Sequence, residues 1–570
     1  MKKIYDNFIK MALAEETSTS SDFLRLKKDI CKKLGVQPPT NADMREHYEK
    51  LVARKEIPRS LAFEKRLQSK KIRTESGVAV VAVLTKSYPC PGQCIYCPTE
   101  AAMPKSYLSN EPAVMRAIAA KFNPRRQVQN RLRALELNGH AIDKVELIVM
   151  GGTFSYLPRN YQQKFITECF QACNEYAYAS KKHTPKKSIQ SLDEKLRLAQ
   201  KKNETAPCRV IGLTLETRPD YIDTREIVNF RKLGCTRVEL GVQSIFDDVL
   251  KINKRGHTIQ KTIEATALLK DAGFKINYHM MPGLPGSNLE RDYQMFAELF
   301  SNPSFQPDML KIYPTVVTKN TKLHAMWKKG NYAPLGDQEF ETFILRVKNN
   351  LIPPYVRIAR LVRDVPTSSI EAGPVISNLR QMIADRSHCP CIRCREVKSD
   401  YTIGDLPAML PSLQESTDYM NSEKNKFSTD SKNSIAKQAG EIILDRIDYA
   451  ASNGTEIFLQ YVSANKKKLF ALLRLRIPNN HNVDHFIPAL RNAALIREVH
   501  TYGKLNKIDT QDANSPQHIG LGKKLLLEAE CIAKEEFSLQ KIAVISGVGV
   551  RHYYRKNGYT LRDTYLVKKI

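Results

Sequence analysis

The sequence predicts an α/β fold: a partial barrel of parallel strands fused to a smaller α+β domain, preceded by a small, basic, mostly helical region. Two observations carry this prediction. Strand-like runs alternate with helix-length segments from about residue 78 to residue 385, as in repeated βα units. Beyond residue 441 the alternation gives way to strand-like runs that follow one another. A length of 570 residues with an apolar share of 42% suits two or more domains.

Residues 1–75 are polar, basic and mostly helical in pattern. Between Arg59 and Arg73, basic side chains are punctuated by Phe63, Leu67 and Ile72. An ordinary solvated helix face has the same pattern. Because the next domain carries the motifs described below and the whole chain has a formal charge of +29, we expect an RNA-binding region here.

Residues 76–385 hold the runs that predict the parallel sheet: Val78–Leu84, Lys144–Met150, Arg209–Leu215, Arg237–Gly241, Lys275–Met280 and Met309–Tyr313. Helix-length segments such as Glu111–Gly139 and Thr258–Ala272 separate them. The polar segment 180–207, rich in Lys, Gln and Ser, interrupts this rhythm and predicts a surface insertion. In barrels of this kind the chemistry lies at the carboxyl ends of the strands.

A short cysteine-rich loop, residues 386–398, and a polar stretch, residues 399–440, separate the two domains. We expect the polar stretch to be a linker or mobile loop. Residues 441–570 predict an α+β domain with a helix after Gly520. Its antiparallel strands are expected at Ile457–Tyr461, Leu469–Arg476, Ala494–Tyr502 and Lys541–Ser546.

Composition restricts the compartment and the partner. No segment has about 20 consecutive apolar residues, so we expect no transmembrane helix. The start, Met1–Asp6, lacks a signal-peptide stretch, which predicts a cytoplasmic protein whose 12 cysteines are ligands or core residues. The net charge favours nucleic acid as the partner over acidic membrane surfaces, because no basic amphipathic helix stands out.

Cys90, Cys94 and Cys97 follow the first predicted strand with C-x3-C-x2-C spacing. Three thiolates on one loop can hold three irons of a [4Fe–4S] cluster and leave the fourth iron open. In radical S-adenosylmethionine (SAM) enzymes, SAM binds that iron and is cleaved to a deoxyadenosyl radical. Zinc is an alternative, but it usually takes four protein ligands, and disulfides would leave one cysteine unpaired. The spacing and the preceding strand therefore predict a radical SAM barrel.

Two later strand ends are candidate SAM contacts. Gly151, Gly152 and Thr153 close the second strand, where glycines let the backbone approach the SAM amino group. A plain strand-to-helix turn is the alternative. Glu216 and Arg218 close the third strand and can hold ribose hydroxyls and the SAM carboxylate. A structural salt bridge would involve the same residue types.

Gln243 and Lys311 lie at the ends of later strands. Gln243 can hydrogen-bond SAM or a substrate. Lys311 is expected to face the barrel mouth and to contact an acyl or phosphate oxygen, which makes it a candidate catalytic residue.

The second cysteine cluster comprises Cys389, Cys391 and Cys394, preceded directly by His388. Thiolates at C-x-C-x2-C spacing suit a tetrahedral Zn²⁺ site, with His388 as the candidate fourth ligand. Adjacent residues seldom both reach one metal, and free thiols in a tight turn are the alternative.

The segment from Gln517 to Lys523, with Gly520 and Gly522, opens a predicted helix in the second domain. A Q-x-x-G-x-G turn exposes backbone N–H groups at a helix N-terminus and can bind pyrophosphate. It lies between a strand ending at His500 and a strand followed by Gly547 and Gly549. This order matches the acetyl-CoA clamp of the GNAT acetyltransferases.

Tyr553 and Tyr554 follow the last of these strands. A phenol there can protonate a leaving CoA thiolate or orient the thioester, whereas aromatic packing is the alternative. His500 is a further candidate acid or base, or else a core histidine.

Taken together, residues 70–570 resemble the Elongator catalytic-subunit family in a single-chain, non-metazoan-style form. Few families fuse a radical SAM barrel to a GNAT domain. The motifs that carry the resemblance are Pro104–Tyr107, Glu111–Pro112, Met115–Ala117, Val149–Phe154, Glu216–Tyr221, Gly241–Ser244, Arg255–Thr258, His279–Pro282 and Lys541–Gly549.

The resemblance implies a tRNA enzyme that uses a [4Fe–4S] cluster, SAM and acetyl-CoA. A deoxyadenosyl radical would remove hydrogen from the acetyl methyl group, and the carbon radical would add to carbon 5 of the wobble uridine. Thioester hydrolysis would leave a carboxymethyl group. The expected partners are the tRNA anticodon stem-loop, bound partly by residues 1–75, and possible accessory subunits or a second copy. The segments 180–207 and 399–440 depart from the family pattern without touching its motifs.

Two other functions compete with this one. A protein lysine acetyltransferase would use the cluster only for structure, and a tRNA-binding module would use neither cofactor. A radical SAM methylthiotransferase is disfavoured, because such enzymes carry a further cysteine set upstream, whereas here only Cys31 precedes Cys90.

Overall fold

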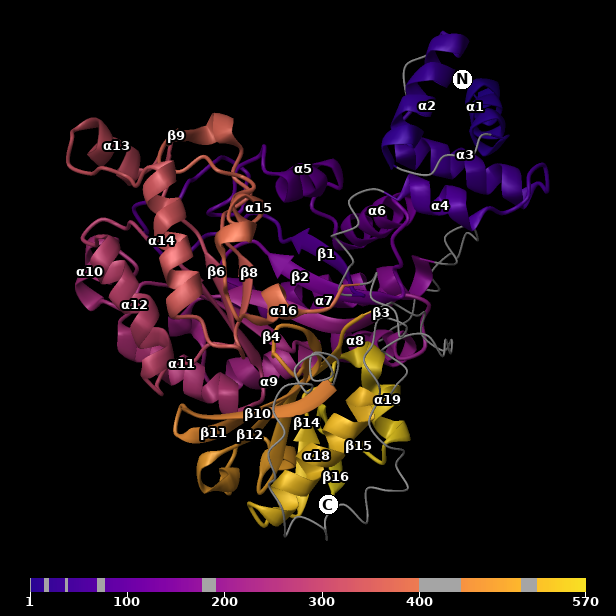
Figure 1. Cartoon of the computed structure of the whole chain (residues 1–570). Coiled ribbons are helices and arrows are strands. Elements are labelled where there is room, and N and C mark those ends of the chain that lie inside the picture. Colours follow the sequence, from indigo (N-terminus) through magenta and orange to yellow (C-terminus); the bar gives the residue numbers. More distant parts are fainter. Residues whose placement is uncertain are drawn as a thin grey trace, which may run out of the picture.

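The computed structural model describes residues 2–14, 20–35, 39–68, 77–176, 191–398, 442–503 and 520–570. Its first domain is built on a seven-stranded parallel sheet that curves into a half-barrel (Figure 1). The strands, in sheet order, are β1 (Ala79–Leu84), β2 (Lys144–Met150), β3 (Arg209–Thr217), β4 (Arg237–Gln243), β5 (Lys275–Met280), β6 (Met309–Ile312) and β8 (Arg357–Arg360). The predicted parallel sheet is thus confirmed, and β8 is an addition to it.

The two faces of this sheet differ in chemistry. Val145, Leu147 and Val149 of β2 alternate with Glu146 and Ile148, and only the first set is fully buried in the core. The register continues this division around the sheet, because Thr214 lies opposite Arg237, and Glu239 opposite Asn277. One face therefore packs apolar side chains against helices, and the other lines the barrel interior, here called the lumen, with polar side chains.

Helices pack against the apolar face and contribute to the main core: α6 (Pro124–Leu137), α7 (Arg159–Glu175), α8 (Leu192–Asn203), α9 (Thr224–Leu233), α11 (Ile259–Asp271), α12 (Leu289–Ser301), α14 (Asp337–Asn350), α15 (Leu379–Met382) and α16 (Ile392–Arg395). The buried residues of α5 (Pro112–Ala119), α10 (Asp247–Ile252) and α13 (Lys322–Lys328) lie outside this core. A two-stranded sheet of β7 (Val317–Thr318) and β9 (Ile370–Ala372) lies beyond β6.

Two sequence predictions for this domain need correction. The segment Glu111–Gly139 is not one helix but two, because Lys121 and Phe122 both have positive φ and Pro124 begins the second helix. The segment 180–207 is not wholly a surface insertion. Its first part lies outside the described residues, but α8 buries Leu196 and Ala199 in the main core.

The second domain is a seven-stranded sheet with the order β10-β11-β12-β13-β14-β16-β15. Its elements are β10 (Ile442–Ala451), β11 (Gly454–Ser463), β12 (Leu469–Ile477), β13 (Ala494–Thr501), α18 (Leu521–Glu535), β14 (Lys541–Val544), α19 (Arg551–Lys556), β15 (Thr560–Arg562) and β16 (Tyr565–Lys569). The expectation of purely antiparallel strands was wrong for β13 and β14, which pair in parallel only from Ala494 to Ile496. Beyond these residues the two strands separate and leave an opening between them.

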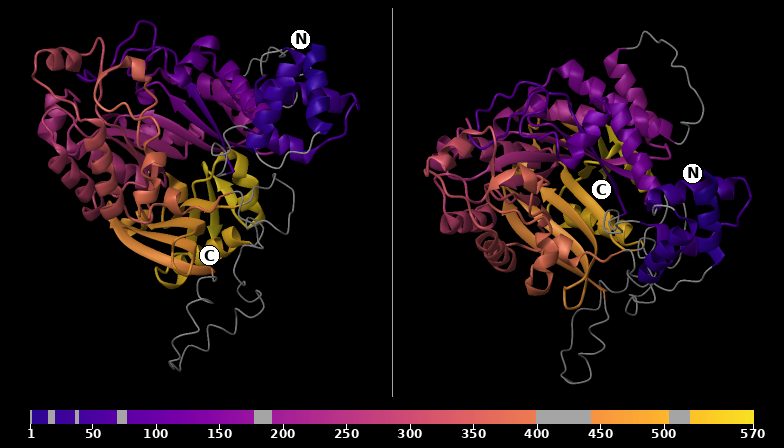
Figure 2. Two further views of the ribbon diagram at one scale, coloured as in Figure 1. Left: turned by 45° about the horizontal axis from the view of Figure 1, so that its top comes forward. Right: turned by 90° about the horizontal axis from the view of Figure 1, so that it is seen from above.

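The N-terminal region forms a helical module with its own core. Its helices are α1 (Lys2–Ala14), α2 (Ser20–Leu34), α3 (Asn41–Ala53) and α4 (Leu61–Leu67). Phe8, Ile30, Tyr48 and Phe63 are among its buried residues, which form a cluster separate from the main core. The module stands to one side of the barrel and touches α6 through α3, where Arg133 pairs with Glu46 at 3.5 Å (Figure 2).

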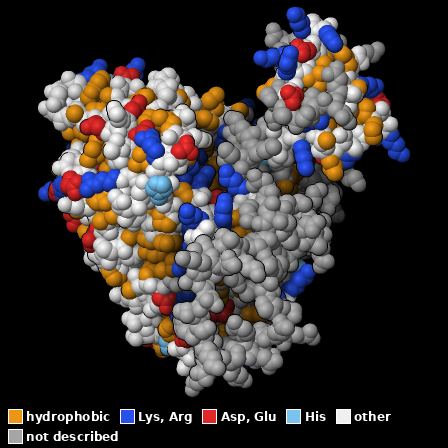
Figure 3. Space-filling view, in the orientation of Figure 1, with side chains coloured by type: hydrophobic (Ala, Val, Ile, Leu, Met, Phe, Trp, Pro, Cys, Tyr) orange, Lys and Arg blue, Asp and Glu red, His pale blue; other side chains and the backbone are white. Residues whose placement is uncertain are grey.

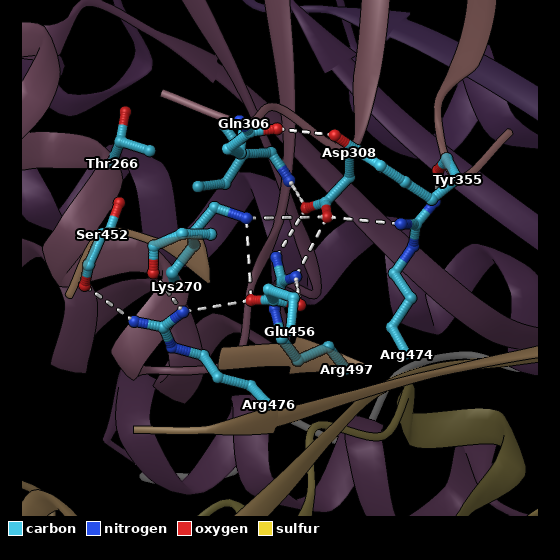
Figure 4. A network of polar contacts seen from close by, with 12 residues as sticks. Thr266, Lys270, Gln306, Asp308, Tyr355, Ser452, Glu456, Arg474, Arg476 and Arg497 are labelled. Atoms are coloured by element: carbon cyan, nitrogen blue, oxygen red, sulfur yellow. Dashed lines mark hydrogen bonds and ion pairs between the residues drawn. The ribbon is translucent and has the colours of Figure 1, made fainter. Parts of the chain in front are cut away.

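The two larger domains share one continuous hydrophobic core. A group of charged side chains, here called the interface ion cluster, lies inside their contact: Lys270, Asp308, Glu456, Arg474, Arg476 and Arg497 (Figure 4). Arg497 donates to Asp308 at 2.5 Å and to Glu456 at 2.7 Å. Because Lys270 and Asp308 belong to the barrel and the other four to the second domain, the cluster fixes how the domains sit together.

Among the described residues, no helix combines the length and the apolar character needed to cross a bilayer.

Candidate active site

The loop that carries Cys90, Cys94 and Cys97 begins at the carboxyl end of β1, as predicted. All three cysteines are half-buried and free of disulfides. Arg255 donates from Nη1 to the sulfur of Cys94 at 3.1 Å, and the Gly92 N–H lies 3.4 Å from the sulfur of Cys90. Donors to sulfur stabilise thiolates bound to a cluster. The loop thus presents three thiols at the site where a parallel barrel carries its chemistry.

Polar atoms without partners surround this loop. Thr85 Oγ1, Arg218 Nη1 and Gln243 Oε1 are buried, and none of them has a hydrogen-bond partner. Arg218 lies against the loop, since a Cβ at Gly92 would clash with its guanidinium. Buried polar atoms are normally satisfied, so several orphans around three free thiols fit a site shaped for a polar ligand. A [4Fe–4S] cluster with SAM matches that donor set.

Gly151 has a φ of +132°, and a Cβ there would collide with the Thr85 hydroxyl. Gly152 follows with a φ of +94°, and Thr153 begins the next turn. Only glycine adopts this path without strain, so the turn after β2 requires Gly151 beside Thr85, and its contact with SAM stays a prediction. Gln243 has a φ of +70°, an unusual value for a residue with a side chain. Such conformations concentrate at functional sites.

Arg218 makes the structural salt bridge that the sequence left open, and its role in SAM binding stays a prediction. It forms a bidentate salt bridge with Asp220 at 2.8 and 2.9 Å, as a structural role predicts. Its remaining nitrogen, Nη1, is the unpartnered atom beside the cysteine loop. Asp220 therefore holds the guanidinium in place while one donor stays free.

A row of polar side chains crosses the lumen near its carboxyl end. The Tyr107 hydroxyl donates to Glu216 at 2.7 Å, and His279 lies 3.8 Å from Glu216 and 3.0 Å from Glu239. Lys311 closes the row with an ion pair to Glu239. Burial lowers the pKa of Lys311, but Glu239, Tyr313 and Glu216 together outweigh burial and raise it, so the pair stays ionised. Lys311 thus faces the lumen, as predicted, with a carboxylate partner.

Sequence reasoning missed Glu239, His279 and Arg255. Each is charged or polar in a segment that otherwise reads as a buried strand or turn. The available signal was the alternation of polar with apolar residues in Arg237–Gln243 and Lys275–Met280, which marks a polar interior face.

The predicted acetyl-CoA site coincides with the opening between β13 and β14. A cavity of about 390 Å³ lies there, lined by Gly520, Gly522, Lys523, His500, Tyr553 and Tyr554 among others. A Cβ at Gly522 would come within 3.1 Å of the Tyr553 hydroxyl, so this phenol lies directly over the turn. The structure therefore brings these predicted residues together. Gln517 lies outside the described residues.

Burial sets the protonation of the candidate acids and bases in this cavity. It lowers the pKa of His500 to about 4 and leaves the Nε2 atom without a partner, so the imidazole is neutral near pH 7. It raises the pKa of both Tyr553 and Tyr554, so each keeps its phenolic proton. Tyr554 is 7% exposed and Tyr553 is 38% exposed, so Tyr553 is the phenol open to a ligand.

Glu498 is the carboxylate that lines the same cavity from β13. It accepts from Lys275 at 2.8 Å and from Arg474 at 2.9 Å. Burial raises its pKa, but these two cations outweigh burial and hold the pKa well below its usual range. A carboxylate so strongly paired is a poor proton acceptor.

The second cysteine group is tighter than the first. The ligand atoms of Cys389, Cys391 and Cys394 all lie within 4.8 Å of one another, the one such grouping among the described residues. Sulfurs that bind one ion lie closer together than sulfurs that bind different irons of a cluster. The close grouping of Cys389, Cys391 and Cys394 therefore suits a single ion, whereas the wider spacing of the first loop suits a cluster. His388 is exposed and is not part of the group, so its role as fourth ligand stays a prediction.

This loop joins the two domains. The Ile392 N–H donates to the Val356 carbonyl at 2.9 Å beside β8, and the Val397 N–H donates to Leu469 of β12 at 3.0 Å. Arg395 reaches Gln460 of β11 at 2.9 Å. A metal at Cys389, Cys391 and Cys394 would therefore brace the domain contact, at a distance from the first cysteine loop.

Basic side chains are spread over the N-terminal module and the barrel. In Figure 3, Lys and Arg lie at several places on the module, near the middle of the face and at its left edge. In α2, for example, Lys32 and Lys33 end a helix whose opposite face is buried in the module core. This distribution is the electrostatic pattern of a polyanion-binding surface.

Comparison with known proteins agrees with this geometry. Residues 85–299 match the Radical SAM superfamily, and residues 307–388 match the Radical_SAM C-terminal domain. The chain is 39% identical to a tRNA uridine(34) acetyltransferase of Methanocaldococcus infernus, covering 100% of this chain and 99% of that protein. It is 37% identical to Elongator complex protein 3 of Homo sapiens, covering 89% of this chain and 86% of that protein.

A solved structure gives the same result. The archaeal Methanocaldococcus infernus Elp3 with an N-terminus deletion (1–46) has a TM-score of 0.67 and 40% identity, covering 87% of this chain and 100% of that chain. The predicted fold class, a radical SAM half-barrel joined to an α+β acetyltransferase-type domain, is thereby confirmed. The chain belongs to the radical SAM family of Elongator complex protein 3 and the tRNA uridine(34) acetyltransferases.

Proposed function

We propose that this protein modifies the wobble uridine of tRNA, joining an acetyl-derived carboxymethyl group to carbon 5 of the base by radical SAM chemistry. The observation that carries the proposal is the pairing, in one chain, of a cysteine loop at one end of a barrel with a CoA-type cavity at the other. The name of the Methanocaldococcus infernus relative points to uridine 34 of tRNA. Together they favour a tRNA uridine carboxymethyltransferase.

The proposed division of labour follows the contacts described above. Cys90, Cys94 and Cys97 would hold the cluster, while Gly151 and Arg218 would contact SAM. When bound, the cluster and SAM supply a deoxyadenosyl radical, and acetyl-CoA supplies the methyl group that loses hydrogen. Arg255 donates to Cys94 and orients the loop.

At the other end, Gly520, Gly522 and Lys523 would bind the CoA phosphates at the start of α18. The Tyr553 hydroxyl keeps its proton and lies beside Gly522, so it can protonate the CoA thiolate when the thioester is hydrolysed. The neutral His500 can orient the attacking water. The Lys311–Glu239 ion pair would line the lumen between this cavity and the cysteine loop.

The tRNA would lie along the basic face formed by the N-terminal module and the barrel. A formal charge of +29 supplies the phosphate-binding field. We propose Zn²⁺ for Cys389, Cys391 and Cys394 as a structural brace, which metal analysis of the purified protein would test: iron without zinc would contradict it.

A protein lysine acetyltransferase is the second candidate, favoured by the CoA-type cavity. That reaction needs a base to remove a proton from the lysine ammonium group. Both carboxylates of the cavity are paired with cations, Glu498 with Lys275 and Arg474 and Glu146 with Arg237, and are poorly suited to this task. His500 also lines the cavity, but burial lowers its pKa to about 4, which makes it a weak base. We therefore rank this function below the tRNA modification.

The deciding experiment is anaerobic incubation of the protein with tRNA, SAM, acetyl-CoA and a one-electron reductant. Nucleosides from the digested tRNA are then analysed by mass spectrometry. The proposal expects carboxymethyluridine with the native protein and none after Cys90, Cys94 and Cys97 are replaced by Ala. Peptide acetylation without carboxymethyluridine would favour the acetyltransferase. Modified uridine that persists in cells carrying the triple variant would favour a binding module.

A further inference from the structure

The CoA-type cavity is not confined to the second domain. Its wall includes Arg237, Lys275, Met309 and Arg357, which are the first residues of β4, β5, β6 and β8. Glu146 of β2 and Gly212 of β3 line it as well. The cavity therefore opens onto the amino-terminal mouth of the barrel.

The cysteine loop lies at the opposite end. Arg255 links Cys94 to the Gly241 carbonyl, near the carboxyl end of β4. Arg237 begins the same strand and lines the cavity. Four residues of β-strand span about 13 Å, so a single lumen of that depth separates the two sites.

The middle of this lumen contains polar atoms with no partner. Thr214 Oγ1, Asn277 Oδ1 and Arg237 Nε are buried and make no hydrogen bond. The register places Thr214 beside Arg237, and Asn277 beside Glu239, all on the lumen face. A barrel packed only for stability would satisfy or replace such groups, because each unpaired buried polar atom costs about 1–3 kcal/mol.

The lumen also keeps solvent-accessible surface. The side chains of Lys311 and Glu216 are 14% and 19% exposed although they point inward, and Ile148 is half-buried. Gly212 leaves further room, because a Cβ there would meet its nearest neighbours, Thr236 Oγ1 and Glu146 Cγ, only at 3.7 and 3.8 Å. The lumen is thus lined by polar side chains and keeps some surface at Lys311 and Glu216, whereas Thr214, Glu239 and Asn277 are buried.

We propose that the acyl end of the CoA thioester enters this lumen through the amino-terminal mouth and meets the radical inside the barrel. Thr214, Arg237 and Asn277 are the positioning residues of this route, with the Thr214 hydroxyl and Arg237 Nε as donors to the acyl carbonyl oxygen. The Lys311–Glu239 ion pair marks its narrowest part, next to the cysteine loop. This inference rests on the proposed function and adds the path of the acyl group.

The route restricts the substrate to small acyl groups. Hydrogen transfer breaks one C–H bond of the acyl methyl group and forms one in 5′-deoxyadenosine. The electron that cleaves SAM comes from a one-electron reductant such as dithionite. A longer or branched acyl chain would be too wide to pass Gly212 at the amino-terminal mouth of the barrel.

The test combines a blocked mouth with a readout of access that needs no cluster. First, Gly212→Ala and Gly212→Leu are compared with the native protein, using acetyl-CoA deuterated at the methyl group. Deuterium in deoxyadenosine is expected to fall in a graded way, by at least about tenfold for Gly212→Leu. SAM cleavage without acetyl-CoA reports whether the far end of the barrel is intact in each variant. Native-like deuterium transfer in Gly212→Leu would overturn the route.

Second, Thr214→Cys and, separately, Asn277→Cys are treated with iodoacetamide in cluster-free protein, and alkylation at that position is read by peptide mass spectrometry. We expect alkylation of the folded protein, protection by a non-hydrolysable acetyl-CoA thioether, and loss of alkylation when Gly212→Leu is added. If the new cysteine reacts only after unfolding in both the Thr214→Cys and the Asn277→Cys variant, the route would be overturned. Absence of deuterium transfer in the native protein, with protection intact, would instead contradict the proposed function and leave the binding route supported.

Discussion

The two ends of the barrel are both rich in charged side chains, but they differ in how those charges are satisfied. At the carboxyl end, Arg218 and Gln243 keep buried atoms without partners beside a loop of free thiols. At the amino end, Asp308 and Glu456 each bind several cations in the interface ion cluster. Lys270 Nζ and Arg474 Nη1 of this cluster also make no hydrogen bond, but each lies within 4 Å of the Asp308 carboxylate, whereas Arg218 Nη1 lies against the cysteine loop.

The contrast has an energetic reason. Two carboxylates in the interface ion cluster face Lys270 and three arginines, so removal of one anion leaves several buried cations uncompensated. Under the proposed function, a bound cluster and SAM would supply the partners that buried atoms at the carboxyl end lack. The following experiments, from the largest expected effect to the smallest, test whether this division holds.

The largest effect is expected at the first cysteine loop. Cys94→Ala removes a ligand and the acceptor of Arg255, so SAM cleavage should fall by at least about a thousandfold, with loss of bound iron. Iron content, visible absorbance and deoxyadenosine yield measure this. Cys391→Ala is the matched control, since it should lower zinc and stability but keep the iron. Equal loss of iron in both variants would contradict the assignment of two separate metal loops.

Asp308→Ala should cause the next largest change, because this fully buried carboxylate pairs with Arg497 and Arg474 from the other domain. We expect the free energy of unfolding to fall by about 3–5 kcal/mol. Chemical denaturation monitored by circular dichroism gives the value. Glu264→Gln removes the exposed pair with Lys261 and should leave the unfolding curve unchanged. Similar denaturation curves for Asp308→Ala and Glu264→Gln would show that the interface ion cluster does not stabilise the domain contact.

Tyr553→Phe tests the amino end as a chemical site. Without a phenol beside Gly522, hydrolysis of the thioester should slow by about a hundredfold while acetyl-CoA affinity is kept. Release of CoA, followed with a thiol reagent, measures the rate. Tyr554→Phe is the control, because that ring is buried and packs edge-on against Tyr553 at 5.3 Å. If Tyr554→Phe slows thioester hydrolysis more than Tyr553→Phe does, Tyr554 rather than Tyr553 would be the proton donor.

Sequence reasoning predicted the parts of this molecule that depend on local order. Cys90, Cys94 and Cys97, the glycines after β2 and the turn at Gly522 are each defined by neighbours along the chain. The lumen row of Glu216, Glu239 and His279 depends on register between strands and was not predicted. Nor was β8, whose four residues follow Pro353 and Pro354.

The other features that the sequence did not predict also depend on contacts between residues far apart in the chain. The parallel pairing of β13 with β14 brings together residues that the sequence separates by α18, and no periodicity encodes it. The interface ion cluster likewise joins Asp308 to Arg497, which are distant in sequence. Strand identity is a local property, whereas strand partners and domain contacts are settled by packing.

The smallest expected effect concerns Lys270, which faces Asp308, Glu456, Arg476 and Arg497 inside the interface ion cluster. Burial lowers its pKa to about 8 in the folded protein, against 10.5 for a lysine exposed to water. Between these two values the unfolded chain binds the proton that the folded chain releases. The free energy of unfolding should therefore rise with pH from about 8 to 10.5, by at most about 1.4 kcal/mol per pH unit. Denaturation of the native protein and of Lys270→Met across this range isolates the contribution, because the variant has no proton to release at this position. A native curve parallel to that of the variant would mean that Lys270 stays charged in the cluster, and that the amino end is even more fully paired than its geometry indicates.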